Sequence, residues 1–326
     1  MELNLLLIAL TIASAIGIGW SIGANDAANS LGTAVGSGVI RLRPAIVQIC
    51  VFGLLGAMLQ GRHVVETVGR AIVPLHAMSG QDAMLVALLA ALSACAWVAL
   101  ATWLKMPIST SHSIVGGVAG AGLAVGAPVA WSRLGDIFLC WFLTPIGAAI
   151  LGYAFYRGLR RLFSVVPPRI GDPLVRALIV ASGWYVAFSW GANDVANAVG
   201  VVSGANIMTL NESIALGGLA IVLGILTLGY RVIETIGKSI TNLLPLMAFA
   251  AQLASAVNVH VYTLAGIPVS TSHSIVGAIF GVGLVRGIRL VNLATLKEIV
   301  ICWIATPFVS GLVGYAGMRA IMFLMP

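Results

Sequence analysis

The sequence predicts an all-α, multi-pass membrane protein made of two inverted-topology repeats. Hydrophobic residues make up 60% of the 326 residues and charged residues only 8%. Apolar stretches long enough to cross a bilayer follow one another along nearly the whole chain. Short polar motifs also recur in the same order in the two halves. We therefore expect a first transmembrane repeat at 1–159, a basic linker at 160–174 and a second transmembrane repeat at 175–326.

The apolar stretches of the first half define its expected crossings. They are approximately Leu3–Ile40, Pro44–Gln60, Ala83–Leu104, Ile108–Val129 and Ile137–Tyr156. The first stretch is too long for one straight helix and contains polar side chains, so we expect a broken or re-entrant helix there. We expect broken or re-entrant helices at the other recurring polar motifs as well. About five crossings per repeat is an odd number, and the second repeat must then have the opposite orientation.

The basic residues indicate how the protein is oriented. The region between the repeats carries Arg157, Arg160, Arg161, Arg169 and Arg176, and the positive-inside rule places it in the cytoplasm. Most other Lys and Arg residues then fall on the same side, and both termini lie outside. We expect a location in the plasma (inner) membrane. Because these charges lie in loops between apolar spans, the net charge of +7 indicates topology and not nucleic-acid binding.

A motif that contains Asn and Asp occurs twice, as GANDAAN at 23–29 and GANDVAN at 191–197. It places a carboxylate inside an apolar stretch, at a cost on the order of a few kcal/mol if the group is ionised. Carboxylate and amide oxygens, together with carbonyls freed by a helix break, suit Na⁺ or H⁺. The cation-binding candidates are Asn25, Asp26, Asn29, Asn193, Asp194 and Asn197. The alternative is that these side chains only cap a helix break.

A second motif, Pro-x-Ser-Thr-Ser-His-Ser, occurs at 107–113 and again at 268–274. Proline followed by hydroxyl side chains predicts the N-terminus of a helix inside the membrane, where free amides and hydroxyls can bind a tetrahedral anion. The anion-binding candidates are Ser109, Thr110, Ser111, Ser270, Thr271 and Ser272. Ordinary N-capping with small-residue packing is the alternative. For His112 and His273, an orienting or packing role competes with proton transfer.

A third motif is Glu-Thr-Val-Gly at 66–69, repeated as Glu-Thr-Ile-Gly at 234–237. Glu66 and Glu234 are separated along the chain by the same interval as Asp26 and Asp194, so one register joins both motifs. An arginine precedes each glutamate at helical spacing. A helix-surface ion pair is therefore the alternative to a role in transport.

Together, these motifs predict an anion held between two half-helix ends and flanked by two acidic cation sites. Carboxylates would repel an anion, so cations or protons must accompany it, which is the physical basis of symport. A channel would need a continuous polar pathway, whereas the polar residues here cluster at broken helices. A membrane enzyme is disfavoured because the sequence contains no nucleophile elbow or metal triad.

The three paired motifs resemble those of the PiT family of inorganic phosphate transporters, and the resemblance covers nearly the whole chain. It implies a cation-coupled secondary transporter that is not an enzyme, with cations at the Asn and Asp residues and phosphate at the Ser/Thr motifs. It also associates Glu66 and Glu234 with transport. The implied partners are inorganic phosphate, Na⁺ or H⁺ and the lipid bilayer, with a homodimer as an option and no cofactor beyond the coupling ion.

The resemblance leaves the transported anion open, because related transporters look able to carry sulfate. Asp26 and Asp194 favour phosphate. Near neutral pH, phosphate retains a P–OH group that a carboxylate can accept, whereas sulfate has no such proton. Na⁺ and H⁺ both remain candidates for the coupling ion, and uptake as a metal-phosphate complex is a further alternative. The brief central loop leaves no room for the large intracellular insertion of some family members.

Overall fold

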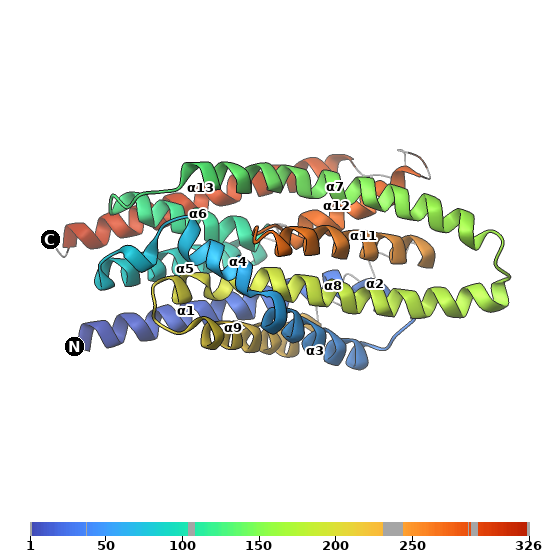
Figure 1. The fold of residues 1–326 in the computed structure, drawn as a ribbon, viewed down its shortest axis with the longest axis horizontal. Helices are drawn as coiled ribbons and strands as arrows, with labels where there is room; N and C mark the ends of the chain where they lie inside the picture. The colour runs from blue at the N-terminus through green and yellow to red at the C-terminus, as the bar shows by residue number, and fades with distance from the viewer. Residues whose placement is uncertain are drawn as a thin grey trace.

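A computed structural model describes residues 2–36, 38–103, 108–230, 244–285, 287 and 293–324 of the chain. Over these residues the regular structure is entirely helical, and most helices run roughly along one long axis (Figure 1). Seven of the described helical stretches are long and apolar enough to cross a membrane. The expected all-α, multi-pass architecture is therefore confirmed.

The helices follow the repeat pattern of the sequence. The first half contains α1 (Glu2–Asp26), α2 (Ala28–Gly36), α3 (Leu42–Gln60), α4 (Arg62–Glu66), the π-helix η1 (Thr67–Ala71), the 3₁₀-helix η2 (Leu75–Ala77), α5 (Gly80–Trp103), α6 (Thr110–Ala124) and α7 (Trp131–Phe163). The second half contains α8 (Pro168–Gly204), α9 (Leu210–Gly224), the π-helix η3 (Ile225–Gly229), α11 (Pro245–Leu264), α12 (Thr271–Leu284) and α13 (Leu293–Leu324). Most of the expected linker is helical, since 160–163 ends α7 and 168–174 begins α8.

Helices α6 and α12 are too short to cross the hydrocarbon core. They have 15 and 14 residues, or lengths of about 22 Å and 21 Å, against about 30 Å for the core. Helix α6 packs along α5, and α12 packs along α11, so each pair forms a helical hairpin. In Figure 1 the α5–α6 hairpin lies in the half of the bundle that contains both termini, and the α11–α12 hairpin lies in the other half.

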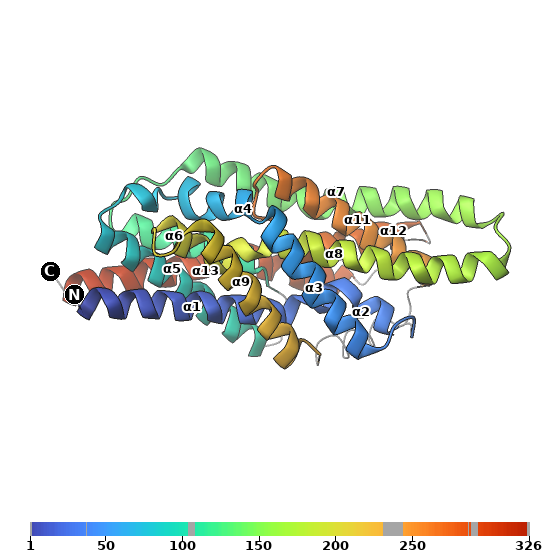
Figure 2. The same ribbon diagram turned by 60° about the horizontal axis from the view of Figure 1, so that its bottom comes forward.

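The hairpins change how the expected crossings are arranged. Two of the five apolar stretches in the first half form a hairpin that enters and leaves at the same end, and the second half contains the equivalent hairpin. Apart from the hairpins, the long helices of the described residues are α1, α3 and α7 in the first half and α8, α9 with η3, and α13 in the second. Three crossings per half is an odd number, so the two repeats remain inverted. Accordingly, Figures 1 and 2 show both termini at one end of the bundle and the α7–α8 connection at the other.

The two repeats pack against each other in reciprocal pairs. Helix α1 packs on α9 and α8 packs on α3, while α6 packs on α13 and α12 packs on α7; Figure 2 shows α9 crossing α1. Two of these contacts depend on glycine. A Cβ at Gly116 would lie 2.2 Å from the carbonyl oxygen of Pro307, and one at Gly277 would lie 2.2 Å from that of Pro145. A glycine three residues after each Ser/Thr motif therefore allows a short helix to dock on the opposite repeat.

The two Asn-Asp motifs differ in backbone conformation. The first lies at the expected break, where α1 ends and the N–H of Ser30 bonds to the carbonyl of Ala27 at 3.3 Å. The second does not, because α8 runs unbroken through Gly191–Asn197. Every residue of Ser189–Gly204 is buried, so a break there would leave backbone groups without polar partners. The expectation of a helix break therefore holds at the first copy only.

Candidate functional site

The tips of the two hairpins meet in the middle of the bundle. Ser111, in the first turn of α6, donates a hydrogen bond to the carbonyl of Val269, just before α12, at 3.0 Å. The indole N–H of Trp141 on α7 donates to the carbonyl of Pro268 at 2.9 Å. From this contact α6 runs toward one end of the bundle and α12 toward the other (Figure 1). The N-termini of the two short helices therefore face a common region.

Ser109 and Ser270 are the N-caps of these helices. Both residues are extended, and their hydroxyl oxygens accept hydrogen bonds from the backbone N–H groups of His112 at 3.3 Å and His273 at 3.2 Å. The structure therefore shows the N-capping that was the alternative interpretation for this motif. A capping hydroxyl accepts through its oxygen and keeps its own O–H, which can still be donated to an anion.

Asp194 lies at the centre of the first polar cluster. One carboxylate oxygen accepts from the side-chain amide of Asn197 at 3.0 Å, and the other accepts from the hydroxyl of Thr271 at 3.2 Å. The same Asn197 amide donates to Ser111 at 2.9 Å and reaches Thr110 at 3.4 Å. Asp194 is 1% exposed and Asn197 is 0% exposed. This cluster therefore joins the second Asn-Asp motif to the Ser/Thr motifs of both repeats.

Asp26 forms a second, looser cluster with the opposite repeat. The hydroxyl of Ser272 and the amide of Asn29 each donate to one Asp26 oxygen at 3.4 Å, and Asn29 also reaches Ser272 at 3.3 Å. These distances are at the long end for hydrogen bonds. Asp26 is buried, and it interacts electrostatically with Asp194. Thr271 and Ser272, which bond Asp194 and Asp26, are neighbours in α12, so both buried carboxylates lie near the same helix end. Their charge there needs cations or protons to balance it.

One acceptor in this region has no donor. Within the described part of the chain, the carbonyl oxygen of the Asn197 side chain is buried and lacks a hydrogen-bond partner. Leaving such an acceptor unsatisfied costs about 1–3 kcal/mol. An amide oxygen is a ligand that a hard monovalent cation can use, so this unsatisfied buried acceptor in the second Asn-Asp motif is consistent with the expected cation site.

A small cavity also lies beside the Asp26 cluster. Its volume is about 10 Å³, and its lining includes Asn29, Ser189, Ser255 and Thr271. A space of this size is enough for about one water molecule. The Ser189 hydroxyl is 1% exposed and has no hydrogen-bond partner in the described structure. The rest of the lining is Val186, Trp190, Ala256 and Val259, so the space has the scale of one water and both polar and apolar walls.

Asn193 and Asn25 differ from the other motif residues. The Asn193 amide donates to Thr263 at 3.0 Å and to the carbonyl of Ile267 at 3.2 Å, while its oxygen accepts from the N–H of Val269 at 3.1 Å. Both ends of this side chain thus hold the turn between α11 and α12. Asn25 donates to the carbonyl of Ser21 at 3.0 Å. The geometry of Asn193 indicates that it positions the hairpin tip.

The two motif histidines stack on tryptophans and contact each other. His112 lies 3.7 Å from Trp141 and His273 lies 3.5 Å from Trp303, measured between ring centroids, and the two imidazoles are 4.6 Å apart. The Nδ1–H of His112 donates to the carbonyl of Trp303 at 3.0 Å. That carbonyl is available because Pro307, four residues later, has no N–H to bond it. These contacts favour the orienting role over proton transfer.

Glu66 lies away from the polar clusters. Its carboxylate pairs with Arg62 at 3.1 Å, four residues earlier on α4, and the side chains are 39% and 68% exposed. This is the helix-surface ion pair that the sequence offered as the alternative to a transport role. Glu234 falls outside the described residues.

Two buried amides that the sequence reasoning missed support the site. Gln252 of α11 donates to the carbonyl of Ser30 at 2.8 Å and accepts from Ser182 at 2.7 Å, which anchors α2 to α8 and α11. Asn258 donates to the carbonyl of Thr144 and to Ser274, both at 3.0 Å. Neither residue belongs to a repeated motif. The sequence signal that could have identified them is a single amide side chain inside an apolar helix. Such an amide needs a polar partner within the membrane.

Comparisons with known proteins agree with the repeat organisation. Residues 22–170 and 164–314 each match the phosphate transporter family. A Pyrococcus horikoshii protein named as a candidate phosphate permease is 33% identical, over 94% of this chain and 95% of its own length. The chloroplastic inorganic phosphate transporter 2-1 of Arabidopsis thaliana is 30% identical, over 88% of this chain and 67% of its own. A solved structure, described as the sodium-dependent phosphate transporter, is 27% identical with a TM-score of 0.88, covering 98% of this chain and 100% of that one.

Proposed function

The chain belongs to the phosphate transporter family, and from this membership we propose that it imports inorganic phosphate by symport with Na⁺. Na⁺ is favoured over H⁺ because the similar solved structure is described as sodium-dependent. In this proposal the protein is a secondary transporter, and phosphate and Na⁺ are its two cargoes.

The observation that carries the proposal is that the two kinds of motif share hydrogen bonds. Asn197 connects Asp194 to Ser111, and Thr271 bonds Asp194 directly. A cation at the Asn-Asp motifs and an anion at the Ser/Thr motifs would therefore lie next to each other. Each ligand would stabilise the other, because the cation offsets the carboxylate charge that otherwise repels the anion.

Phosphate is proposed to bind where the N-termini of α6 and α12 face each other. Free backbone amides and the positive end of each helix dipole favour an anion at such a place. The six motif residues Ser109, Thr110, Ser111, Ser270, Thr271 and Ser272 carry hydroxyls that can donate without adding charge. Ser111, Thr271 and Ser272 would first release their present acceptors, which are Val269, Asp194 and Asp26. The cation is proposed to bind at Asp26, Asn29, Asp194 and Asn197. Asn25 and Asn193 are then assigned to holding the backbone around these sites.

The chemistry of the site favours phosphate over sulfate. Asp26 and Asp194 are both buried acceptors close to the region where the anion would bind. Phosphate near neutral pH carries a P–OH that can donate to a carboxylate, whereas sulfate carries none. A sulfate permease remains the alternative, and transport of sulfate in preference to phosphate would replace the proposed substrate.

We also propose an orientation in the membrane. Arg157, Arg160 and Arg161 lie at the end of α7, beside the α7–α8 connection. The positive-inside rule places this end of the bundle in the cytoplasm and both termini outside the plasma membrane. A protease site or a cysteine added at the C-terminus tests this orientation in sealed, right-side-out vesicles. The proposal predicts that external protease cleaves the site and that a membrane-impermeant thiol reagent labels the cysteine, whereas protection of both would contradict it.

Transport by the purified protein in liposomes tests the proposed function. Uptake of labelled phosphate is measured under an inward Na⁺ gradient, under a proton gradient alone, and with no gradient. The proposal predicts phosphate accumulation that requires Na⁺. Accumulation driven only by protons would keep the phosphate site and replace the coupling ion. The absence of phosphate accumulation under every gradient, with the protein inserted and folded, would contradict the proposal.

A further inference from the structure

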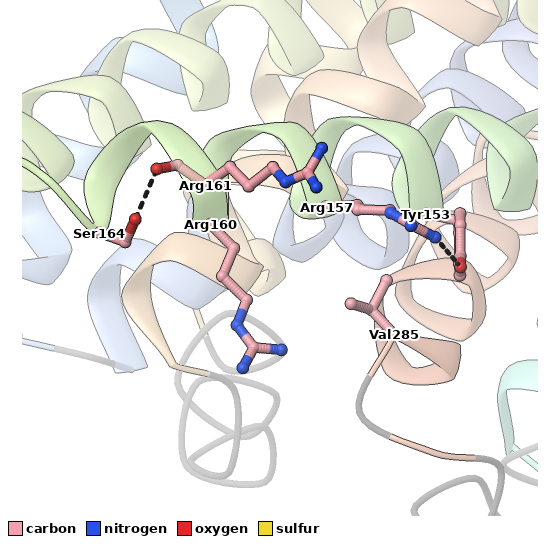
Figure 3. Close-up of a pocket in the computed structure, with 6 residues that line it drawn as sticks. All are labelled: Tyr153, Arg157, Arg160, Arg161, Ser164 and Val285. Carbon is pink, nitrogen blue, oxygen red and sulfur yellow. Dashed lines mark hydrogen bonds between the residues drawn. The ribbon is translucent and has the colours of Figure 1, made fainter.

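A pocket on the surface of α7 carries an unusual group of charges. Its volume is about 390 Å³, and it lies toward the C-terminal end of the helix. Its lining residues are Tyr153, Arg157, Arg160, Arg161, Ser164 and Val285. Figure 3 shows that the arginines come from one short stretch of α7 and that Val285 comes from the other side, at the end of α12. None of these residues belongs to the Asn-Asp or Ser/Thr motifs.

The length of α7 places the pocket near the membrane surface. Its 33 residues correspond to about 50 Å, compared with about 30 Å for the hydrocarbon core. At least one end of this helix must therefore extend into the headgroup layer. The arginine-bearing end is the one that extends, because in Figure 1 α7 and α8 project past the other helices near their connection. Guanidinium groups at this depth can reach lipid phosphates.

The three arginines have no acidic partner in the described structure. Arg160 and Arg161 follow Arg157 by three and four residues, so each of them lies next to Arg157 on the surface of α7. No carboxylate lines the pocket, and the ion pair found in the described part of the chain joins Arg62 to Glu66 elsewhere. Like charges this close repel each other, and an anion bound between them would remove the repulsion.

The pocket also holds one guanidinium in place. Nη1 of Arg157 donates to the Tyr153 hydroxyl at 2.9 Å, and its Cζ lies 6.0 Å from the centre of the Tyr153 ring. The Ser164 hydroxyl donates to the carbonyl of Arg161 at 2.7 Å, which fixes the end of the helix. Figure 3 shows the two hydrogen bonds as dashed lines. Part of the ordering cost of binding is therefore met before a ligand arrives.

We propose that this pocket binds a phosphate group, carried either by an anionic lipid headgroup or by free inorganic phosphate. Guanidinium groups match phosphate geometry because their parallel N–H donors can engage two oxygens. Val285 provides an apolar wall that suits the glycerol or acyl portion of a lipid. This pocket is separate from the proposed transport site, so an experiment can contradict one proposal and leave the other standing.

The lipid source is tested by native mass spectrometry of the full chain released from detergent micelles. Phosphatidylglycerol and phosphatidylcholine are added in equal amounts, and bound lipids are counted for wild type, Arg160→Gln/Arg161→Gln and Arg169→Gln/Arg176→Gln. The last variant removes the same charge from exposed positions of α8, at the same end of the protein but outside the pocket. A lipid headgroup in the pocket predicts preferential phosphatidylglycerol binding that falls about fivefold or more in the first variant and is kept in the second.

The free-phosphate source is tested by calorimetric titration with inorganic phosphate in nanodiscs made only of phosphatidylcholine. A pocket that holds free phosphate predicts a binding event beyond the transport site, which disappears in Arg160→Gln/Arg161→Gln and persists in Arg169→Gln/Arg176→Gln. Either a lipid or a phosphate result of this form supports the proposal. If wild type binds neither ligand more tightly than Arg160→Gln/Arg161→Gln does, the proposal is overturned.

A lysine variant distinguishes specific phosphate binding in the pocket from attraction by the overall positive charge of this end of the protein. Arg160→Lys/Arg161→Lys keeps both charges but loses the paired N–H donors, so the pocket predicts binding about threefold weaker or more. Binding equal to that of wild type would attribute the effect to net charge and would overturn the proposal. Because this change is conservative and exposed, size-exclusion elution and thermal unfolding should match those of wild type.

Discussion

The side-chain amide of Asn197 donates a hydrogen bond to the hydroxyl of Ser111 at 2.9 Å, across the boundary between the two repeats. The same amide donates to Asp194 at 3.0 Å. A single side chain therefore contacts both a residue proposed to bind the cation, Asp194, and a residue proposed to bind the anion, Ser111. If phosphate and Na⁺ bind as proposed, this residue is where their binding is coupled.

Asn197→Ala is expected to lower Na⁺-driven phosphate uptake by about tenfold or more. It removes a hydrogen bond to a buried carboxylate, of the kind worth about 1.5–3 kcal/mol, and a neutral one to Ser111, of the kind worth about 0.5–1.5 kcal/mol. Uptake into liposomes as a function of Na⁺ concentration is the measurement. Asn211→Ala, at an exposed position of α9, is the matched control and should behave as wild type. Normal Na⁺ dependence in Asn197→Ala would rule out the coupling role.

Asp194→Asn and Asp26→Asn are both expected to impair coupled transport, and Asp194→Asn should do so more strongly. Asp194 receives bonds at 3.0 Å and 3.2 Å, whereas both bonds to Asp26 measure 3.4 Å. Removing the charge also removes the reason for a cation to accompany phosphate. Phosphate uptake by folded, inserted protein is compared with that of Asp136→Asn, an exposed residue of α7. Unchanged ion dependence in both site variants would show that these carboxylates do not bind the cation.

Ser109→Ala and Ser111→Ala should differ in kind. Ser109 caps α6, so its loss is expected to lower stability by about 1 kcal/mol and to lower the thermal unfolding temperature. Ser111 bonds Val269 and Asn197 at the hairpin tips, so its loss should raise the KM for phosphate. Unfolding and initial uptake rates are measured for both variants. An unchanged KM in Ser111→Ala, with normal insertion, would exclude it from the anion site.

Gly277→Ala is expected to destabilise the protein by about 1–3 kcal/mol, because the new methyl group would overlap the carbonyl of Pro145 at 2.2 Å. Gly135→Ala is the control, since nothing lies within 4 Å of a Cβ at that position of α7. Alanine is favoured over glycine within a helix, so the control should be as stable as wild type or slightly more stable. Thermal unfolding in detergent compares the two. Equal stability of both variants would show that α12 does not dock on α7 as described.

Much of the fold followed from the sequence because duplication leaves a visible pattern. The paired motifs at Asp26 and Asp194 predicted two repeats, and the Pro-Ser-Thr pattern predicted helix starts where α6 and α12 begin. Re-entrant helices at the motifs were expected, but the pairing of α6 with α5 and of α12 with α11 was not, because apolar composition does not say which helices form a hairpin. Their arrangement depends on α6 packing along α5 and on close contacts at Gly116 and Gly277.

The candidate site was predicted as a set of residues, but the role of each one required the structure. Asn193 and Asn197 occupy similar places in the motif, yet the first holds the α11–α12 turn and the second bridges Asp194 and Ser111. They lie four residues apart on α8, and only tertiary packing determines what each amide meets. The contact between His112 and Trp303 could likewise not be predicted from the sequence. It depends on the Trp303 carbonyl, which is left without a helical partner by Pro307 in the other repeat.

The central claim is that cation and anion bind next to each other and stabilise each other. The most direct measurement is the equilibrium affinity of the purified protein for phosphate over a range of Na⁺ concentrations, with choline holding ionic strength constant. If the two sites are coupled, linkage requires that the affinity for phosphate rise with Na⁺ concentration in wild type. The account further predicts a smaller rise in Asn197→Ala. Phosphate affinity that is the same at every Na⁺ concentration would contradict the account.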